Sequence, residues 1–416
     1  MRPPSPAPVD RAAPASRRTI ALAVVVAALG YFVDIYDLIL FGVVRKPSLA
    51  ALGVAAADMQ AVGERLLNYQ MVGMLVGGVV WGVLGDKRGR LSVLFGSIIT
   101  YSLANIANGM VDDVDTYAWL RFVAGLGLAG ELGAGITLVS ELMPAGARGW
   151  ATTIVATVGI AGGVVASLVG DALAWRHAYY VGGGLGLALL ALRLGVRESA
   201  MFAAVRTRAV ARGRLTAVLW PPRRLRRYLS VIAVGVPIWY VVGILIFFSA
   251  EIGGALGVTP PPKPAEALRY CYLGLAFGDV LSGALSQALG SRRRAIAAFL
   301  ALTAVGVTGY FTVGARSPTA FLAACLVTGL GAGYWAVFVT SAAEQFGTNL
   351  RATVATTAPN MVRAAVVPMT LGYKALRPRW GIVPGAIAIG AVTLAVALVA
   401  LALLDETHGR DLDFEE

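Results

Sequence analysis

Twelve apolar runs, each long enough to cross a lipid bilayer, constrain this chain more than any other feature. A crossing helix needs about 20 mostly apolar residues. Runs of this kind lie at 20–44, 62–84, 92–111, 116–142, 150–170, 178–196, 229–252, 268–290, 294–313, 318–341, 352–373 and 382–404. Of the 416 residues, 57% are hydrophobic and 14% are charged, which excludes an ordinary soluble globule. We predict an all-α membrane protein with twelve transmembrane helices.

Several classes of protein are excluded by motifs that the sequence lacks. It has no G-x4-G-K-[ST] phosphate loop, no HExxH zinc motif, no paired CxxC and no G-x-S-x-G nucleophile motif. Cys271 and Cys325 both fall inside apolar runs and have no metal-ligand spacing. The net charge of +12 fits basic loops that face anionic lipid, so it requires no nucleic acid. We expect no cofactor, no metal and no enzyme activity, with a small-molecule substrate and the bilayer as partners.

The distribution of lysine and arginine predicts the orientation of the chain. Positively charged loops stay in the cytoplasm. If this chain crosses the membrane twelve times at the runs given above, most of its lysines and arginines lie on the same side as both termini. Both termini are therefore predicted to be cytoplasmic, in a bacterial-type inner membrane. The predicted organisation is a polar cytoplasmic tail (1–18), an N-terminal six-helix bundle (19–196), a basic cytoplasmic linker (197–228), a C-terminal six-helix bundle (229–404) and a cytoplasmic tail (405–416).

The second half of the chain repeats the first at an offset of about 204 residues, as expected of a transporter built from two parallel halves. The segment GVLGDKRGRLSVLFG aligns with QALGSRRRAIAAFLA. A longer alignment, of 125–153 with 329–357, pairs Glu141 with Glu344 and Arg148 with Arg351. Because the same acid and arginine recur at the same spacing, we predict two pseudo-symmetric bundles of six helices.

The chain resembles the major facilitator superfamily of secondary transporters over nearly its whole length. The resemblance rests on G-x3-D-[KR]-x-G-R, present from Gly82 to Arg90, on the acid-to-arginine loops and on the ETHGR ending. It implies a cytoplasmic gate in which Asp86 meets the amino end of the eleventh helix, where the helix dipole favours an anion. The second half has Ser291 in place of Asp86, so this contact is expected in one half. The expected gate residues are Gly85, Asp86, Lys87, Arg88, Gly89, Arg90, Glu141, Arg148, Glu344 and Arg351.

Four acidic residues, Asp34, Asp37, Glu131 and Asp279, fall inside predicted spans. A charge there costs roughly 2.5 to 3.5 kcal/mol. Asp34 and Asp37 share a helix face, and their D-x-x-D spacing resembles the aromatic acid:proton symporters; the GLAGELGAG around Glu131 resembles the metabolite:proton symporters. Four acids and one central base cannot all be ionised cheaply, so we predict that these carboxyls couple transport to protons. Buried structural ion pairs are the alternative for Asp34 and Glu131. Arg121, near a span end, is expected to reach the interface.

Arg363 is the one strong positive charge expected near the centre of the membrane. A guanidinium group binds carboxylate or phosphate through two hydrogen bonds, which predicts an organic anion as substrate. The expected substrate-binding residues are Arg363, Asn360, Tyr31, Tyr240 and Trp335. The alternative for Arg363 is a permanent salt bridge to Asp34, Asp37 or Glu131, and the alternative for the aromatic residues is ordinary packing.

Together these features predict a proton-coupled symporter that moves a small organic anion by alternating access and functions as a monomer. A proton-driven exporter or antiporter and a uniporter are alternatives within transport. A membrane receptor or enzyme on a transporter scaffold is the alternative from another class.

Overall fold

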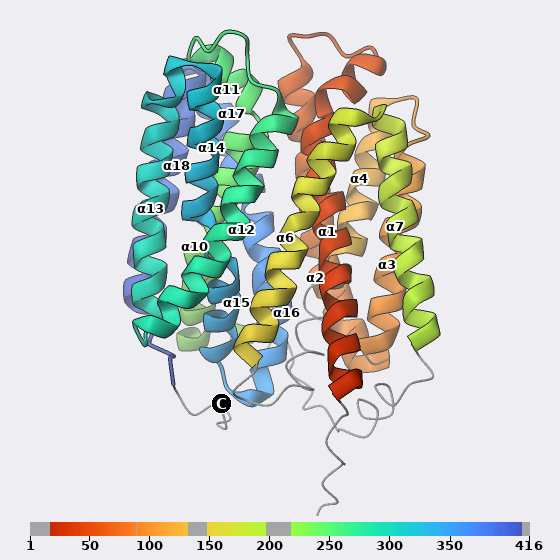
Figure 1. Cartoon of the computed structure of the whole chain (residues 1–416), viewed down its shortest axis with the longest axis vertical. Coiled ribbons are helices and arrows are strands. Elements are labelled where there is room, and N and C mark those ends of the chain that lie inside the picture. The colour runs from red at the N-terminus through yellow and green to blue at the C-terminus, as the bar shows by residue number, and fades with distance from the viewer. Residues whose placement is uncertain (1–16, 89, 132–147, 197–217, 410–416) are drawn as a thin grey trace, which may run out of the picture.

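The computed structural model describes residues 17–88, 90–131, 148–196 and 218–409, and every regular element in these ranges is a helix. Two helical bundles stand side by side with their long axes aligned (Figure 1). The first contains α1 (Arg17–Ala51), α2 (Met59–Arg88), α3 (Arg90–Asn108), α4 (Val114–Leu128), α6 (Arg148–Ala172) and α7 (Trp175–Val196). This bundle covers the first six predicted spans.

The second bundle covers the last six spans and contains three crossings that are broken into pieces. Its elements are α10 (Pro222–Tyr240), the π-helix η2 (Val241–Ile246), α11 (Ser249–Ala255), α12 (Pro264–Ala288), α13 (Arg292–Thr312), the short 3-10 helix η3 (Gly314–Arg316), α14 (Pro318–Ala332), α15 (Trp335–Glu344), α16 (Thr348–Ala364), α17 (Val366–Trp380) and α18 (Ile382–Leu403). The seventh crossing is α10–η2–α11, the tenth is α14–α15 and the eleventh is α16–α17. The seventh begins at Pro222, seven residues before the apolar run at 229–252, because its first turns are basic.

Six helical stretches in the described ranges are long and apolar enough to cross a membrane by themselves. They are Val24–Ala51, Ile154–Ala172, Pro222–Ile246, Arg292–Arg316, Pro318–Glu344 and Ile382–Leu403. Other crossings carry charges or breaks. The helix α12 contains Glu266, Arg269 and Asp279, for example, and the eleventh crossing changes helix at Ala365. Bundle packing, rather than hydropathy alone, therefore accommodates the polar groups in these helices.

The bundles meet mainly where α6 packs against α12 and where α2 packs against α16. The helix α1 begins, and α18 ends, at the same end of the molecule, the lower end in Figure 1. We call this the termini end and the opposite end the far end. The helices α4 and α14 end one repeat offset apart, at Leu128 in the fourth crossing and at Ala332 in the tenth.

The segment after α18 returns to the start of α13 and supplies a carboxylate that the repeat lacks there. The hydroxyl of Ser291 donates to Glu406, and the backbone N–H of Arg292 donates to Glu406 at 2.9 Å. Partial burial opposes ionisation of Glu406, but the hydrogen bonds from Ser291 and from the backbone of His408 and Arg292 prevail and lower its pKa to about 2. Glu406 is therefore ionised at the amino end of α13, the place that corresponds to Asp86 in the first half.

Candidate functional site

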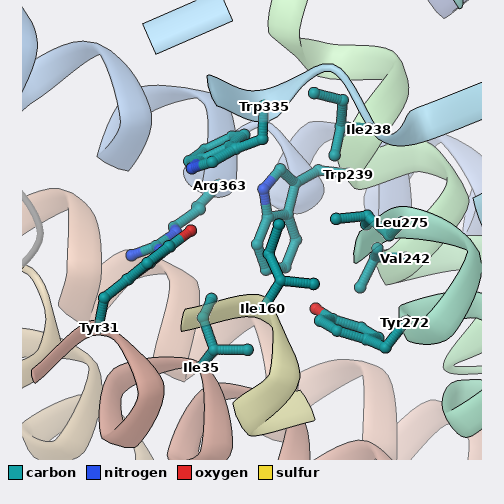
Figure 2. A pocket seen from close by; sticks show the side chains of 10 residues that line it. All are labelled: Tyr31, Ile35, Ile160, Ile238, Trp239, Val242, Tyr272, Leu275, Trp335 and Arg363. Atoms are coloured by element: carbon teal, nitrogen blue, oxygen red, sulfur yellow. The ribbon is translucent and has the colours of Figure 1, made fainter. Parts of the chain in front are cut away.

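A small cavity lies between the two bundles (Figure 2). The first bundle contributes residues of α1 and α6, and the second contributes residues of α10, η2, α12, α15 and α16. The lining residues are Tyr31, Ile35, Ile160, Ile238, Trp239, Val242, Tyr272, Leu275, Trp335 and Arg363. The wall is therefore aromatic and aliphatic, with one guanidinium group.

Arg363 joins the two bundles at this cavity. Its Nη2 donates to Oδ2 of Asp34 at 3.2 Å, and both side chains are fully buried. Its Cζ lies 5.7 Å from the ring centroid of Trp335, and Figure 2 shows the Tyr31 ring beside the guanidinium. Nε and Nη1 of Arg363 make no hydrogen bond to any residue that the structure describes. Two donors of a buried arginine are thus left at the wall of the cavity.

Asp37 lies one turn beyond Asp34 on α1 and interacts with a different arginine. Asp37 is fully buried in the first bundle, where Arg121 is its principal countercharge. The charged atoms of Asp37 and Arg121 lie more than 4.0 Å apart, so the two residues form no ion pair. Those of Asp34 and Arg363 lie 3.2 Å apart. The Cζ of Arg121 instead lies 5.1 Å from the ring centroid of Phe41 and 5.8 Å from that of Tyr179. Arg121 is fully buried, so the expectation that it reaches the membrane interface is wrong.

Glu131 forms an ion pair within the first bundle. Both oxygens of Glu131 accept hydrogen bonds from Arg193, which lies in the last turn of α7. Gly30 of α1 leaves room for this pair, because a Cβ there would meet the Glu131 carboxylate and the guanidinium of Arg193. Arg193 lies three residues before the end of the apolar run at 178–196, so hydropathy alone does not indicate it as the partner of an acid inside the bundle.

Asp279 accepts a hydrogen bond from the backbone N–H of Ala336 at 2.7 Å. Asp279 lies on α12 and is fully buried, while Ala336 is the second residue of α15. Of the predicted proton-coupling residues, Asp34 and Asp37 therefore lie on α1 next to two different arginines, Glu131 is paired inside the first bundle, and Asp279 meets a helix start in the second.

Two of the predicted substrate-binding residues do not line the cavity. The amide of Asn360 donates to the carbonyl oxygen of Ala129 at 2.9 Å, which joins α16 to the residue that follows α4. The hydroxyl of Tyr240 donates to the carbonyl oxygen of Ala386 at 2.9 Å, toward α18. Its neighbour Trp239 lines the cavity instead. Tyr31, Trp335 and Arg363 lie together at the cavity.

Most of the predicted cytoplasmic gate falls outside the part of the chain whose side chains the structure describes. This holds for Gly85, Asp86, Lys87, Arg88, Gly89, Arg90, Glu141 and Arg148. Glu344 is described and forms an ion pair with Arg292 at 3.4 Å, and it accepts from the hydroxyl of Thr407 at 2.8 Å. Arg351 donates to the carbonyl oxygen of Phe346 at 3.4 Å.

Among the described residues, four ion pairs join the bundles at the far end, and we call them the far-end ion pairs. One of them links Lys46 to Glu251 at 3.4 Å. Arg45 pairs with Glu251 at 2.9 Å, Arg269 with Asp171 at 3.1 Å and Arg377 with Glu64 at 2.7 Å. Arg45 is fully buried and Glu64 nearly so, which shields these charges from solvent screening. The far-end ion pairs therefore hold the bundles together at this end.

We expect the double variant Glu64→Gln/Glu251→Gln to separate the bundles at the far end. Each substitution leaves Arg377 or Arg45 without its carboxylate, which destabilises the state in which the far end is closed. We expect the population that is open at the far end to rise about tenfold or more. The distance distribution between spin labels on Ala56→Cys and Thr259→Cys, measured by double electron–electron resonance, should then gain a longer component. The control is Asp115→Asn, which removes the exposed pair with Arg65 inside the first bundle; an unchanged distance distribution in the double variant would contradict the expectation.

These features define a helical membrane protein with two bundles around a central, mostly apolar cavity. A family model described as the Major Facilitator Superfamily matches residues 20–356, so the chain belongs to this superfamily. It is an integral membrane transport protein rather than an enzyme, and the predicted twelve-helix fold in two bundles is confirmed.

Relatives and a solved structure agree with this assignment over almost the whole chain. A cis,cis-muconate transport protein of Acinetobacter baylyi is 26% identical and covers 91% of this chain and 92% of its own. The niacin transporter of the same bacterium is 25% identical and covers 84% of this chain and 86% of its own. The crystal structure of a D-xylose-proton symporter has a TM-score of 0.71 at 16% identity, with 94% of this chain and 100% of that chain covered.

Proposed function

We propose that the protein is a proton-coupled symporter of small aromatic or unsaturated carboxylates. The observation that carries the proposal is Arg363, a buried guanidinium with two unused donors at the wall of an otherwise aromatic and aliphatic cavity. A carboxylate bound there replaces Asp34 as the partner of Arg363 through two hydrogen bonds. Two of the relatives are named after niacin and cis,cis-muconate, which are both organic acids with a planar apolar body.

Four aromatic rings fit such a body. Tyr31, Trp239, Tyr272 and Trp335 lie around the cavity and approach it from both bundles (Figure 2). A planar ring stacks against such side chains more favourably than a hydroxyl-rich sugar does, because the wall offers few hydrogen-bond partners. The cavity therefore favours an apolar carboxylate over a neutral polar solute.

Asp37 is the carboxyl that we assign to the coupling proton. Asp34 and Glu131 each have an arginine in direct contact, which favours their ionised forms. Asp37 is fully buried, and its countercharge Arg121 packs on the Phe41 and Tyr179 rings without direct contact. A buried carboxyl without a close ion pair is held most cheaply with its proton on. Gain and loss of this proton, as Arg121 moves away or approaches, would accompany the alternation between states.

Alternating access then follows from the two ends of the bundles. The far-end ion pairs close one side, and we place the gate of Asp86 and its basic neighbours at the termini end. We assign the termini end to the cytoplasm of a bacterial inner membrane. In this orientation the far-end ion pairs close the outer side. The substrate carboxylate separates from Arg363, Arg363 pairs with Asp34 again, and the substrate leaves toward the cytoplasm.

Purified protein in liposomes tests the proposal. We expect an inward proton gradient to drive accumulation of [14C]benzoate and [14C]niacin above equilibrium and an ionophore to abolish it. Benzamide, which has the same ring without the charge, serves as the control and should neither accumulate nor compete. Uptake that ignores both pH gradient and membrane potential would indicate a uniporter, and accumulation driven by the opposite gradient would indicate an antiporter.

Two glycines on α6 make room for the aromatic wall, and substitution there should impair substrate binding. A Cβ at Gly159 would meet the Tyr31 ring, and one at Gly163 would meet the Tyr272 ring. We expect Gly159→Ala and Gly163→Ala each to raise the KM for benzoate by about 3- to 10-fold, because overpacking moves the rings. Gly184→Ala is the matched control, since open space surrounds its Cβ position. An unchanged KM in both cavity variants would exclude these rings from the binding site.

A further inference from the structure

The tenth crossing is broken beside the cavity. The helix α14 ends at Ala332, and α15 begins at Trp335 after Gly333 and Tyr334. The first amides of a helix have no partner inside the helix and need an acceptor from elsewhere. Tyr334, the residue that precedes α15, gives no side-chain hydrogen bond to it. The start of α15 therefore depends on another element.

Asp279 supplies this acceptor from α12. Its Oδ1 accepts from the N–H of Ala336 at 2.7 Å, as the side chain of a capping residue does, although it lies 57 residues earlier in the chain. Close backbone contact makes the reach possible. A Cβ at Gly333 would lie 2.6 Å from the Cα of Gly278, so α12 and the segment between α14 and α15 touch without side chains in between. A carboxylate at this place also lies at the positive end of the α15 dipole.

Trp335 is the first residue of α15 and lines the cavity. Its ring lies 5.4 Å from the ring of Phe338 and 5.7 Å from the Cζ of Arg363. On the opposite side, Tyr272 and Leu275 line the cavity from the same helix that carries Asp279. The carboxylate of Asp279 thus fixes the first turn of α15, and that turn fixes the ring above Arg363.

We propose that Asp279 is a positioning residue for substrate selection: it caps α15 across the helix break and so holds Trp335 in the cavity wall. In this role Asp279 acts as a hydrogen-bond acceptor and takes no part in the coupling of transport to protons. The transport measurements below rest on the proposed function, whereas amide exchange at α15 does not.

Amide hydrogen exchange tests the cap directly. We compare the wild-type protein, Asp279→Asn and Asp279→Ala in lipid nanodiscs and follow peptides that cover 333–339. Asn keeps an oxygen acceptor, so its exchange should match wild type, whereas Ala should raise exchange at Ala336 about tenfold or more. Ser282→Ala is the matched control, because it removes a buried hydroxyl one turn away on α12 that bonds only to its own helix. Unchanged protection in Asp279→Ala would overturn the cap.

Benzoate uptake separates positioning from proton coupling. Asp279→Ala should raise the KM about 3- to 10-fold with Vmax within about twofold, and Asp279→Asn should keep both the KM and the accumulation ratio. Loss of accumulation in Asp279→Asn, with counterflow intact, would make Asp279 a proton carrier and overturn the proposal. A wild-type protein that does not transport benzoate would refute the proposed substrate, and amide exchange would still decide the cap.

A double variant shows whether Asp279 acts through Trp335. Trp335→Phe should raise the KM for benzoate on its own, and adding Asp279→Ala should raise it no further, because the second change removes support for a ring already lost. Additive effects would contradict action through Trp335. If Asp279→Ala yields no folded protein, Trp335→Phe and Asp279→Asn still decide: an unchanged KM in the first or lost accumulation in the second would overturn the proposal.

Discussion

Arg363→Ala is expected to lower kcat/KM for benzoate uptake by about 100-fold or more. Hydrogen bonds to a charged group contribute about 1.5 to 3 kcal/mol each, and every 1.36 kcal/mol corresponds to roughly a factor of ten. The variant loses two such bonds to the carboxylate, together with the positive charge. Arg363→Lys keeps the charge but not the planar pair of donors, so we expect an intermediate loss. Initial rates of [14C]benzoate uptake in proteoliposomes measure both variants.

Stability must be separated from binding in this experiment. Removal of Arg363 leaves Asp34 buried without its partner, which costs about 3 to 5 kcal/mol in comparable pairs. The double variant Arg363→Ala/Asp34→Asn removes both charges and should regain thermal stability without regaining uptake. A folded Arg363→Ala protein with wild-type efficiency would remove Arg363 from the substrate site.

The contacts of Arg363 could be predicted from sequence only as a pair of alternatives. One central arginine among several buried acids suggests both an anion site and a salt bridge, and the structure contains the salt bridge to Asp34 together with two unused donors at the cavity. Arg363 and the acids can be identified from the sequence because a charge inside an apolar run is costly and indicates a specific role. Partner choice depends on how the helices rotate about their axes, which hydropathy does not specify.

Arg121 and Arg193 show where depth along a helix misleads. Both lie near the ends of apolar runs, where a long side chain normally reaches water. Arg121 is buried beneath Phe41 and Tyr179, and Arg193 turns back to Glu131. The number of central bases in the described chain is therefore larger than the sequence indicated, and the balance of buried charge is closer to neutral.

The cap at α15 could not be predicted at all from local sequence. Its acceptor and donor lie on different helices, and the break at Gly333 resembles many glycine-rich stretches in this chain. The repeat offers part of the signal, because α4 ends at Leu128, the position that corresponds to Ala332. Position 279 corresponds to Met74 in the first half, so the helix end recurs in both halves, whereas the carboxylate at position 279 does not.

Asp37→Asn is expected to abolish proton-driven accumulation of benzoate while exchange continues. In the described core, Asp34 and Glu131 are matched by Arg363 and Arg193, and Asp279 meets a helix start, which leaves Asp37 and Arg121 facing each other without direct contact. Asparagine resembles the protonated carboxyl in shape but cannot release a proton. The variant should therefore complete the bundle movement with substrate bound and lose the step that a proton gradient drives.

Two measurements separate these outcomes for Asp37→Asn. Accumulation under an inward proton gradient should fall from above equilibrium to equilibrium, and counterflow of [14C]benzoate against unlabelled benzoate should stay within about twofold of wild type, since exchange needs no net proton movement. Asp115→Asn is the control, because it neutralises an exposed carboxylate of the same bundle. Accumulation that persists in Asp37→Asn would move the proton to another acid. Asp34 would then be the first candidate, because substrate binding at Arg363 releases its carboxylate and lets a proton replace the lost guanidinium.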